Sequence, residues 1–73
     1  MSGNAPAKKF RVGYVTANVW KNEGTTNPFF TVDINRTYKD SDDKLQNTAS
    51  LGHADLLVAA RLLQLASDWI MAQ

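Results

Sequence analysis

Hydrophobic and polar positions alternate along the first two thirds of this chain and then recur with a helical spacing. Before Gly52 the apolar period is near two, as in β-strands, and after it the period is near 3.6, as in an α-helix. The expected strands cover residues 10–20, 29–39 and 45–51, and the expected helix follows Gly52 and continues to Gln73. The chain is therefore predicted to be an α+β protein: an antiparallel meander of three strands, or four, followed by one long C-terminal helix.

Side-chain alternation assigns faces to these strands, because successive residues of a strand point to opposite sides. The apolar set predicted to face the core is Val15, Ala17, Val19, Phe30, Val32 and Ile34. Phe10 and Val12 have the opposite parity, so we expect a bulge or kink near Gly13. The outer face, to which we assign Gln46 and Thr48 of the last strand, is predicted to be mostly polar and uncharged.

The predicted helix has more apolar surface than one sheet can cover. Its apolar residues span roughly 220° of arc, whereas a helix that covers a sheet needs little more than about 100°. A second copy of the chain, related by a two-fold axis, is the economical partner, and a groove in another protein is the alternative. The helix residues expected at the interface between two copies are Leu62, Leu65, Ala66, Trp69 and Ile70.

The length supports the same expectation. With 73 residues and 8.1 kDa the chain forms one domain, predicted over residues 8–73 after a disordered arm of residues 1–7. A domain of this size buries only roughly 60% of its unfolded surface, and without cysteine it has neither disulfides nor a zinc finger to stabilise it. Oligomerisation is the remaining common route. No segment resembles a signal peptide or a membrane span, so we expect a cytoplasmic protein.

The sequence contains few residues that could support catalysis. His53 is the only histidine, so a nucleophilic triad would depend on one residue at the start of a helix. Asp40, Asp42 and Asp43 lack the glycine and distant glutamate of a calcium-binding loop, and an ordinary hairpin turn explains them. We therefore expect no enzymatic activity, no metal and no cofactor.

Positive charge is concentrated in the strands. Residues 1–39 contain six basic and two acidic residues, a net charge of +4, whereas the remainder has two basic and five acidic residues, a net charge of −3. A polyanion would therefore meet the sheet. The pI of about 8.1 is below the value above roughly 9 that marks a strongly nucleic-acid-binding domain, so electrostatics alone does not establish this function.

Aromatic residues interleave with these basic residues, a combination that single-strand binders use to stack bases and hold phosphates. The candidate nucleic-acid contacts are Lys9, Arg11, Trp20, Lys21, Phe29, Arg36, Tyr38 and Lys39. The alternative is that the aromatic residues only pack the edges of a small core. Asp33, expected in the middle of the outer face, opposes a phosphate path there.

The order of elements resembles the single-stranded DNA-binding domain of positive cofactor four and small bacterial or phage proteins of that fold. The resemblance rests on Trp20-Lys21, on a second strand that runs from Val32-Asp33-Ile34 to Tyr38-Lys39-Asp40, on Ser50-Leu51 and on the final helix. It covers nearly the whole chain after residue 9. It implies helix-paired dimers, single-stranded DNA on curved sheets, and stacking roles for Trp20 and Tyr38 beside Lys21. The loop at 22–28 is longer than in that family, and the last strand lacks its basic residues.

The sequence thus predicts a homodimeric, non-enzymatic binder of single-stranded DNA or RNA, an accessory protein of transcription or replication. The alternative hypothesis is a small protein-interaction module that modulates a larger complex.

Overall fold

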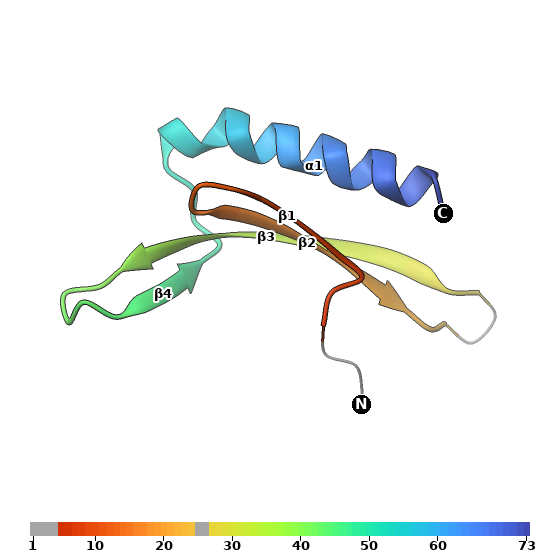
Figure 1. Cartoon of the computed structure of the whole chain (residues 1–73), viewed down its shortest axis with the longest axis horizontal. Helices are drawn as coiled ribbons and strands as arrows, with labels where there is room; N and C mark the ends of the chain where they lie inside the picture. The colour runs from red at the N-terminus through yellow and green to blue at the C-terminus, as the bar shows by residue number, and fades with distance from the viewer. Residues whose placement is uncertain (1–4, 25–26) are drawn as a thin grey trace.

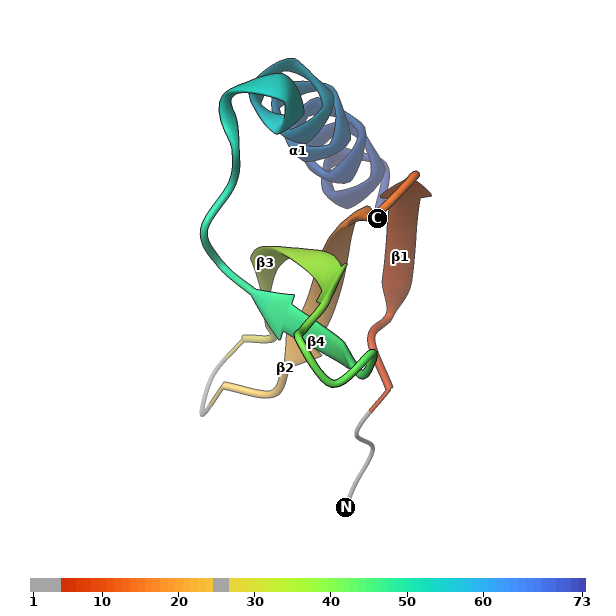
Figure 2. The ribbon, with the colours of Figure 1, turned by 90° about the vertical axis from the view of Figure 1, so that its left-hand side faces the viewer.

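The computed structural model describes residues 5–24 and 27–73, and it consists of a four-stranded sheet covered on one side by a helix (Figure 1). The elements are β1 (Lys8–Val12), β2 (Val15–Asn22), β3 (Phe29–Lys39), β4 (Leu45–Thr48), the 3-10 turn η1 (His53–Asp55) and α1 (Leu56–Met71). The strands are antiparallel and lie in the order β1-β2-β3-β4. Figure 2 shows α1 on one side of the sheet. The α+β prediction of a sheet followed by a C-terminal helix is confirmed.

The first predicted strand is in fact two strands. Its residues form the β1–β2 hairpin, in which Val12 pairs with Val15 across the two loop residues Gly13 and Tyr14. Gly13 has a φ of +59°, which fits a type II′ turn with glycine at its first central position. The predicted bulge is therefore a full reversal of the chain. This reversal explains the change of parity, because Val12 and Val15 face the same side when they lie opposite each other.

The strand β3 is longer than its neighbours, and its two halves have different partners. Residues Phe29 to Arg36 pair with β2, whereas β4 pairs only with Arg36 to Lys39. The β3–β4 hairpin, residues 36–48, therefore projects beyond the rest of the sheet, and we call it the arm (Figure 1). The whole molecule measures 45 × 28 × 15 Å.

The arm corrects one assignment of faces. Gln46 pairs with Tyr38 and Thr48 pairs with Arg36, which in turn pairs with the core residue Val15. Paired residues share a face, so Gln46 and Thr48 lie on the helix side and not on the outer side as predicted. Counting residues along the sequence did not give the register, because the turn before β4 sets it.

The helical segment begins with a 3-10 turn. The N–H of Gly52 donates to Oδ2 of Asp55 at 3.1 Å, and the N–H of Asp55 donates to the Gly52 carbonyl at 2.9 Å. The pair satisfies two backbone groups at the start of the helix, and the bond from the Gly52 N–H to the Asp55 side chain is the half of a capping box that a glycine allows. The predicted start after Gly52 is therefore confirmed, although the α-helix proper begins at Leu56.

The core lies between α1 and the strands β1 and β2. Its buried apolar residues are Val15, Ala17, Val19, Ala59, Leu62 and Ala66. Toward β3, the rings of Phe30 and Trp69 meet edge to face, with 5.7 Å between their centroids and 87° between their planes. The predicted inward faces of β2 and β3 are therefore confirmed by register, and Ile34 packs against the core, whereas Val32 lies on the same side but is 36% exposed.

Much of the helix face that we assigned to contact with a second copy faces the sheet instead. Leu62 and Ala66 are each only 1% exposed, so they have no surface to offer to another protein. Leu65 packs against the core and Trp69 against Phe30. Of the five residues predicted at the interface, Leu62 and Ala66 therefore lie in the core of the monomer, whereas Leu65, Trp69 and Ile70 remain half-buried. A 220° apolar arc does not reveal which part faces the sheet.

Two further expectations concern the chain as a whole. Of the N-terminal segment 1–7 that was predicted to be disordered, residues 1–4 lie outside the described residues. The N–H of Ala7 donates to the carbonyl oxygen of Val19 at 2.7 Å, which attaches Ala7 to the sheet. Within residues 5–24 and 27–73, no helix has the length and apolar character needed to span a membrane.

Candidate nucleic-acid interface

The register divides the eight predicted binding residues between the two sides of the sheet. Five lie on the open face, which we define as the face opposite α1: Lys9, Arg11, Trp20, Phe29 and Lys39. The other three, Lys21, Arg36 and Tyr38, lie on the helix side. This division follows from alternation, because Trp20 and Lys21 are neighbours in one strand and must point to opposite sides.

A carboxylate organises the middle of the open face. Oδ1 of Asp33 accepts from Nδ2 of Asn18 at 2.9 Å, and Oδ2 accepts from the indole Nε1 of Trp20 at 2.6 Å. These bonds fix the edge of the Trp20 ring above the sheet. They also occupy both oxygens of the single acidic side chain in the centre of this face, so Asp33 is a structural acceptor as well as a negative charge.

Two aromatic side chains lie near one end of the open face. Trp20 is paired with Thr31, and Phe29 is two residues from Thr31 on the same side, so the two rings are diagonal neighbours. Phe29 is 52% exposed, and Trp20 is half-buried. Between them, Nδ2 of Asn22 donates to Oγ1 of Thr31 at 3.0 Å. Phe29 thus offers an exposed ring and Trp20 a half-buried ring fixed by its bond to Asp33, and such rings can stack on unpaired bases.

Two cations on β1 border the same face. Lys9 is paired with Asn18 and Arg11 with Thr16, so both side chains lie beside the polar middle of the sheet. The Nε of Arg11 donates to the Gly13 carbonyl at 2.8 Å, which directs the guanidinium toward the turn. Within the described part of the chain, neither cation lies within 4.0 Å of a carboxylate oxygen. Both charges therefore remain free to meet an anion.

The helix-side cations have other neighbours. Nε of Arg36 is buried 3.4 Å from Oδ2 of Asp55, and this ion pair joins β3 to the turn that precedes α1. The guanidinium also lies 5.9 Å from the centroid of the Tyr38 ring. Lys21 is paired with Phe30, under the C-terminal part of the helix. Arg36 is thus a structural residue, and Lys21 cannot act with Trp20 on one surface.

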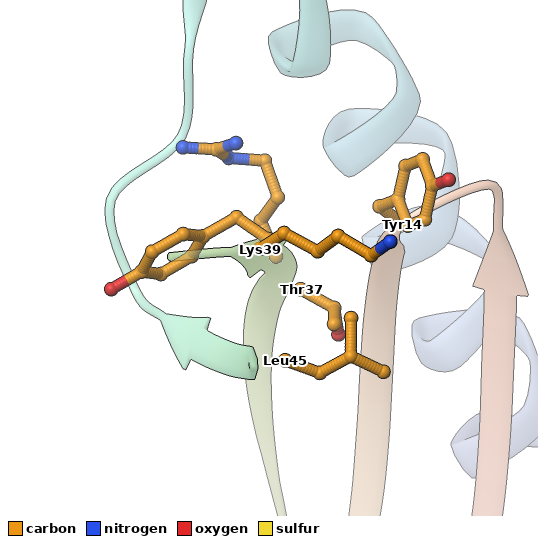
Figure 3. Close-up of a pocket in the computed structure, with 6 residues that line it drawn as sticks. Tyr14, Thr37, Lys39 and Leu45 are labelled. Atoms are coloured by element: carbon orange, nitrogen blue, oxygen red, sulfur yellow. The ribbon is translucent and has the colours of Figure 1, made fainter. Parts of the chain in front are cut away.

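The structure also contains a notch that the sequence analysis missed. It has a volume of about 300 Å³ and lies where the β1–β2 turn faces the arm (Figure 3). Its lining residues are Tyr14, Arg36, Thr37, Tyr38, Lys39 and Leu45. Three of these were candidate binding residues, whereas Tyr14 and Leu45 were not. The Gly13-Tyr14 turn brings Tyr14 to this place, and the sequence analysis missed it because it predicted one continuous strand over residues 10–20.

Comparison with known protein families, curated proteins and solved structures finds no match to this chain.

Proposed function

We propose that this protein is a non-enzymatic, homodimeric binder of single-stranded nucleic acid, DNA in the first instance, and that the strand lies on the open face of the sheet. The observation that carries the proposal is the combination on this face of two free cations, Lys9 and Arg11, with two ring surfaces, Trp20 and Phe29. Cations hold phosphates without regard to sequence, and rings stack on any unpaired base.

The uncharged middle of the face complements this arrangement. Asn35 and Thr37, which are half-buried, present amide and hydroxyl groups between the cations of β1 and the arm, next to the buried Thr16 and Asn18. Such groups can bond to phosphates, sugars or base edges without a charge of their own. The negative charge of Asp33 opposes a phosphate directly above it, so we place the phosphates along β1 and the bases toward Trp20.

The helix supports the choice of a single strand over a duplex. Recognition of duplex DNA commonly places a helix in the major groove, and such a helix needs cations to meet the phosphates. The polar stripe of α1 consists of Arg61, Gln64 and Asp68, whose charges cancel, and Nη1 of Arg61 donates to Oε1 of Gln64 at 3.3 Å. The helix therefore has no basic surface with which to enter a groove.

The outer side of the helix supports the homodimer. Leu56, Ala60, Leu63, Ser67 and Ile70 follow one another at spacings of four, three, four and three residues, and we call them the helix seam. Large and small side chains alternate along it symmetrically about Leu63. In an antiparallel pair of helices, Leu56 would lie near Ile70 of the other copy and Ala60 near Ser67. A seam that matches itself in this way favours a second copy over an unrelated partner.

The dimensions of the molecule agree with an unpartnered surface. Its accessible surface is 5368 Å², whereas a compact protein of 8.1 kDa is expected to expose about 4500 Å². Part of the excess of about 900 Å² lies on the projecting arm, and the exposed Leu56 and Leu63 contribute to the rest. One partner of a standard interface buries about 800 Å². The excess is of the same order, and part of it belongs to the arm.

The test is fluorescence anisotropy of a labelled 20-nucleotide single strand at several salt concentrations, with the matching duplex alongside. We expect preference for the single strand and an affinity that falls steeply with salt. Replacing Lys9 and Arg11 together by Gln should lower the affinity and reduce the salt slope by up to about 1.5, because two phosphate contacts are lost. Lys21→Gln, on the opposite side of the sheet, is the matched control and should change neither.

Absence of binding at low salt would refute the nucleic-acid proposal. A dimer that binds no oligonucleotide would instead favour the protein-interaction module as the function. If Lys21→Gln weakened binding as much as the β1 variant did, the strand would lie on the helix side and the choice of face would be wrong.

A further inference from the structure

The notch between the β1–β2 turn and the arm exists because the first residue of β2 lies opposite a residue before the end of β3, so the end of β3 extends past β2. Val15, the first residue of β2, is paired with Arg36, so β3 continues for three residues without a β2 neighbour. The arm supplies one wall at Leu45, and the turn supplies the other at Tyr14. Figure 3 shows Tyr14 across the opening from Thr37 and Leu45, with the side chain of Lys39 extending between them.

One edge of β3 is left without a partner strand inside this notch. The N–H of Thr37 donates to the carbonyl of Tyr14 at 2.8 Å, whereas the N–H of Asp40 donates to Lys44 on the other side. Backbone groups of alternate residues point to the same edge of a strand. The N–H and C=O of Lys39 therefore point to the edge on which Thr37 meets Tyr14, where β2 does not reach. They offer a donor and an acceptor to a ligand.

The walls of the notch are apolar and its rim is cationic. Tyr14 and Leu45 are each 66% exposed, although they are large apolar side chains. Lys39 Nζ is 4.0 Å from Oδ1 of Asp43, but both groups are largely exposed, so solvent and salt weaken this pair. A ring could thus stack on the exposed Tyr14 while the Lys39 ammonium, next to it, binds an attached anion.

Resting on the proposed function, we propose that the notch is a pocket for one nucleobase of the bound strand. The base stacks on Tyr14, its polar edge bonds to the free backbone of Lys39, and the Lys39 ammonium meets a neighbouring phosphate. A nucleobase fits because it combines a planar ring with a donor and an acceptor along one edge. The cavity of about 300 Å³ is at the small end of ligand sites, which suits a single base.

The location joins the pocket to the rest of the interface. Lys39 and Thr37 belong to the open face, and Thr37 Oγ1 donates to Oδ1 of Asn47 at 2.8 Å beside the notch. A strand that passes Trp20 and crosses the polar middle of the sheet would reach the notch at the arm. The pocket would thus hold the nucleic-acid strand at one end of the open face, and Phe29 lies at the other end.

The first test compares Tyr14→Ala with Tyr14→Phe in the anisotropy experiment with the 20-nucleotide single strand. Tyr14 is largely exposed in a turn, so neither variant should unfold the chain, and circular dichroism checks this. We expect Tyr14→Ala to lose roughly fivefold or more in affinity, the low end of what stacking of one base on an aromatic ring contributes. Tyr14→Phe should bind like the parent. The salt slope should be unchanged in both, because Tyr14 contacts no phosphate.

The second test follows backbone amides by NMR during titration with adenosine monophosphate or with ribose 5-phosphate, which has the same phosphate and no base. We expect the Lys39 amide to shift with the nucleotide and not with the sugar phosphate. Equal shifts with both would identify an anion site and overturn the base pocket.

The two levels of the proposal fail in different ways. If the parent protein binds the single strand and Tyr14→Ala binds it equally well, the pocket is overturned and the proposed function stands. If the parent protein binds no single strand, the proposed function fails and the pocket fails with it.

Discussion

The two faces of β2 are both almost inaccessible to solvent, but for different reasons. On the helix side, Val15, Ala17 and Val19 are 0 to 2% exposed beneath apolar side chains of α1. On the open face, Thr16 and Asn18 are 8 and 9% exposed, although no helix or strand of residues 5–24 and 27–73 covers them. Side chains of the flanking strands surround them, and the Asp33 carboxylate binds Asn18 and Trp20. One face thus stabilises the fold by apolar burial, whereas the other holds a polar surface in place.

This difference assigns separate tasks to the faces. Apolar packing is non-directional, so the helix side can stabilise the sheet without fixing any particular contact. Hydrogen bonds are directional, so the open face holds its ring and its amide in defined positions. A surface prepared in this way loses less conformational entropy when it binds a ligand.

Leu62→Ala should have the largest effect, because Leu62 is the largest fully buried side chain of the helix. Removing a buried leucine side chain costs about 2–5 kcal/mol, comparable with the total stability expected for a domain of this length. Thermal unfolding followed by circular dichroism measures the effect. Leu57→Ala, at a position 85% exposed, is the matched control. Equal destabilisation by both would mean that α1 faces the sheet with a different side.

Leu63→Lys tests the helix seam. Leu63 is exposed at the centre of the seam, so its replacement should leave the monomer folded while it places two like charges against each other across the two-fold axis. We expect sedimentation to change from a dimer to a monomer. Leu57→Lys, outside the seam, should remain dimeric. If Leu63→Lys remained dimeric, the copies would not pair through this surface.

Asp33→Asn should affect the open face in two opposite directions. One of its two hydrogen bonds should be lost, because an amide has a single acceptor oxygen, and this lowers the free energy of unfolding by about 1–3 kcal/mol. Loss of the negative charge should raise the affinity for a single strand by up to about fivefold. Asp68→Asn on the helix makes the same change of charge as a control. An unchanged affinity for Asp33→Asn would place the strand away from the middle of this face.

Acidification should affect the arm only locally. The pKa of Asp40 is lowered from its usual value of 3.8, first by the backbone N–H of Lys44 and then by the Gln46 side chain and the N–H of Asp42. A lowered pKa means that this stabilisation is complete above the unfolded value and is lost as the pH falls through the folded value. NMR titration should show the Lys44 amide, which donates to Asp40, changing at a pH below 3.8, and Asp40→Asn should abolish this change. Titration of Asp40 above that value would contradict the observed hydrogen bonds.

The sequence predicted what depends on local pattern. The alternation in β2 and β3, the long turn between them and the start of the helix after Gly52 all follow from residues near one another in the chain. The reversal at Gly13 was missed, although the change of parity there was the signal, because a two-residue loop leaves a strand pattern almost continuous. The face of α1 that meets the sheet was not predictable from an arc apolar on most sides. The notch depends on where β2 and β3 begin and end relative to each other, which is a tertiary property.

The two tryptophans offer the most direct test of the claim that a single strand binds the open face. Trp20 lies on that face, whereas Trp69 packs on Phe30 between α1 and the sheet. The measurement is an NMR titration of the two indole N–H resonances, assigned with Trp20→Phe and Trp69→Phe, against a 20-nucleotide single strand. We predict that the Trp20 resonance shifts as binding saturates, whereas the Trp69 resonance remains in place. A shift confined to Trp69, or binding that moves neither resonance, would show that the strand does not lie over Trp20 on the open face.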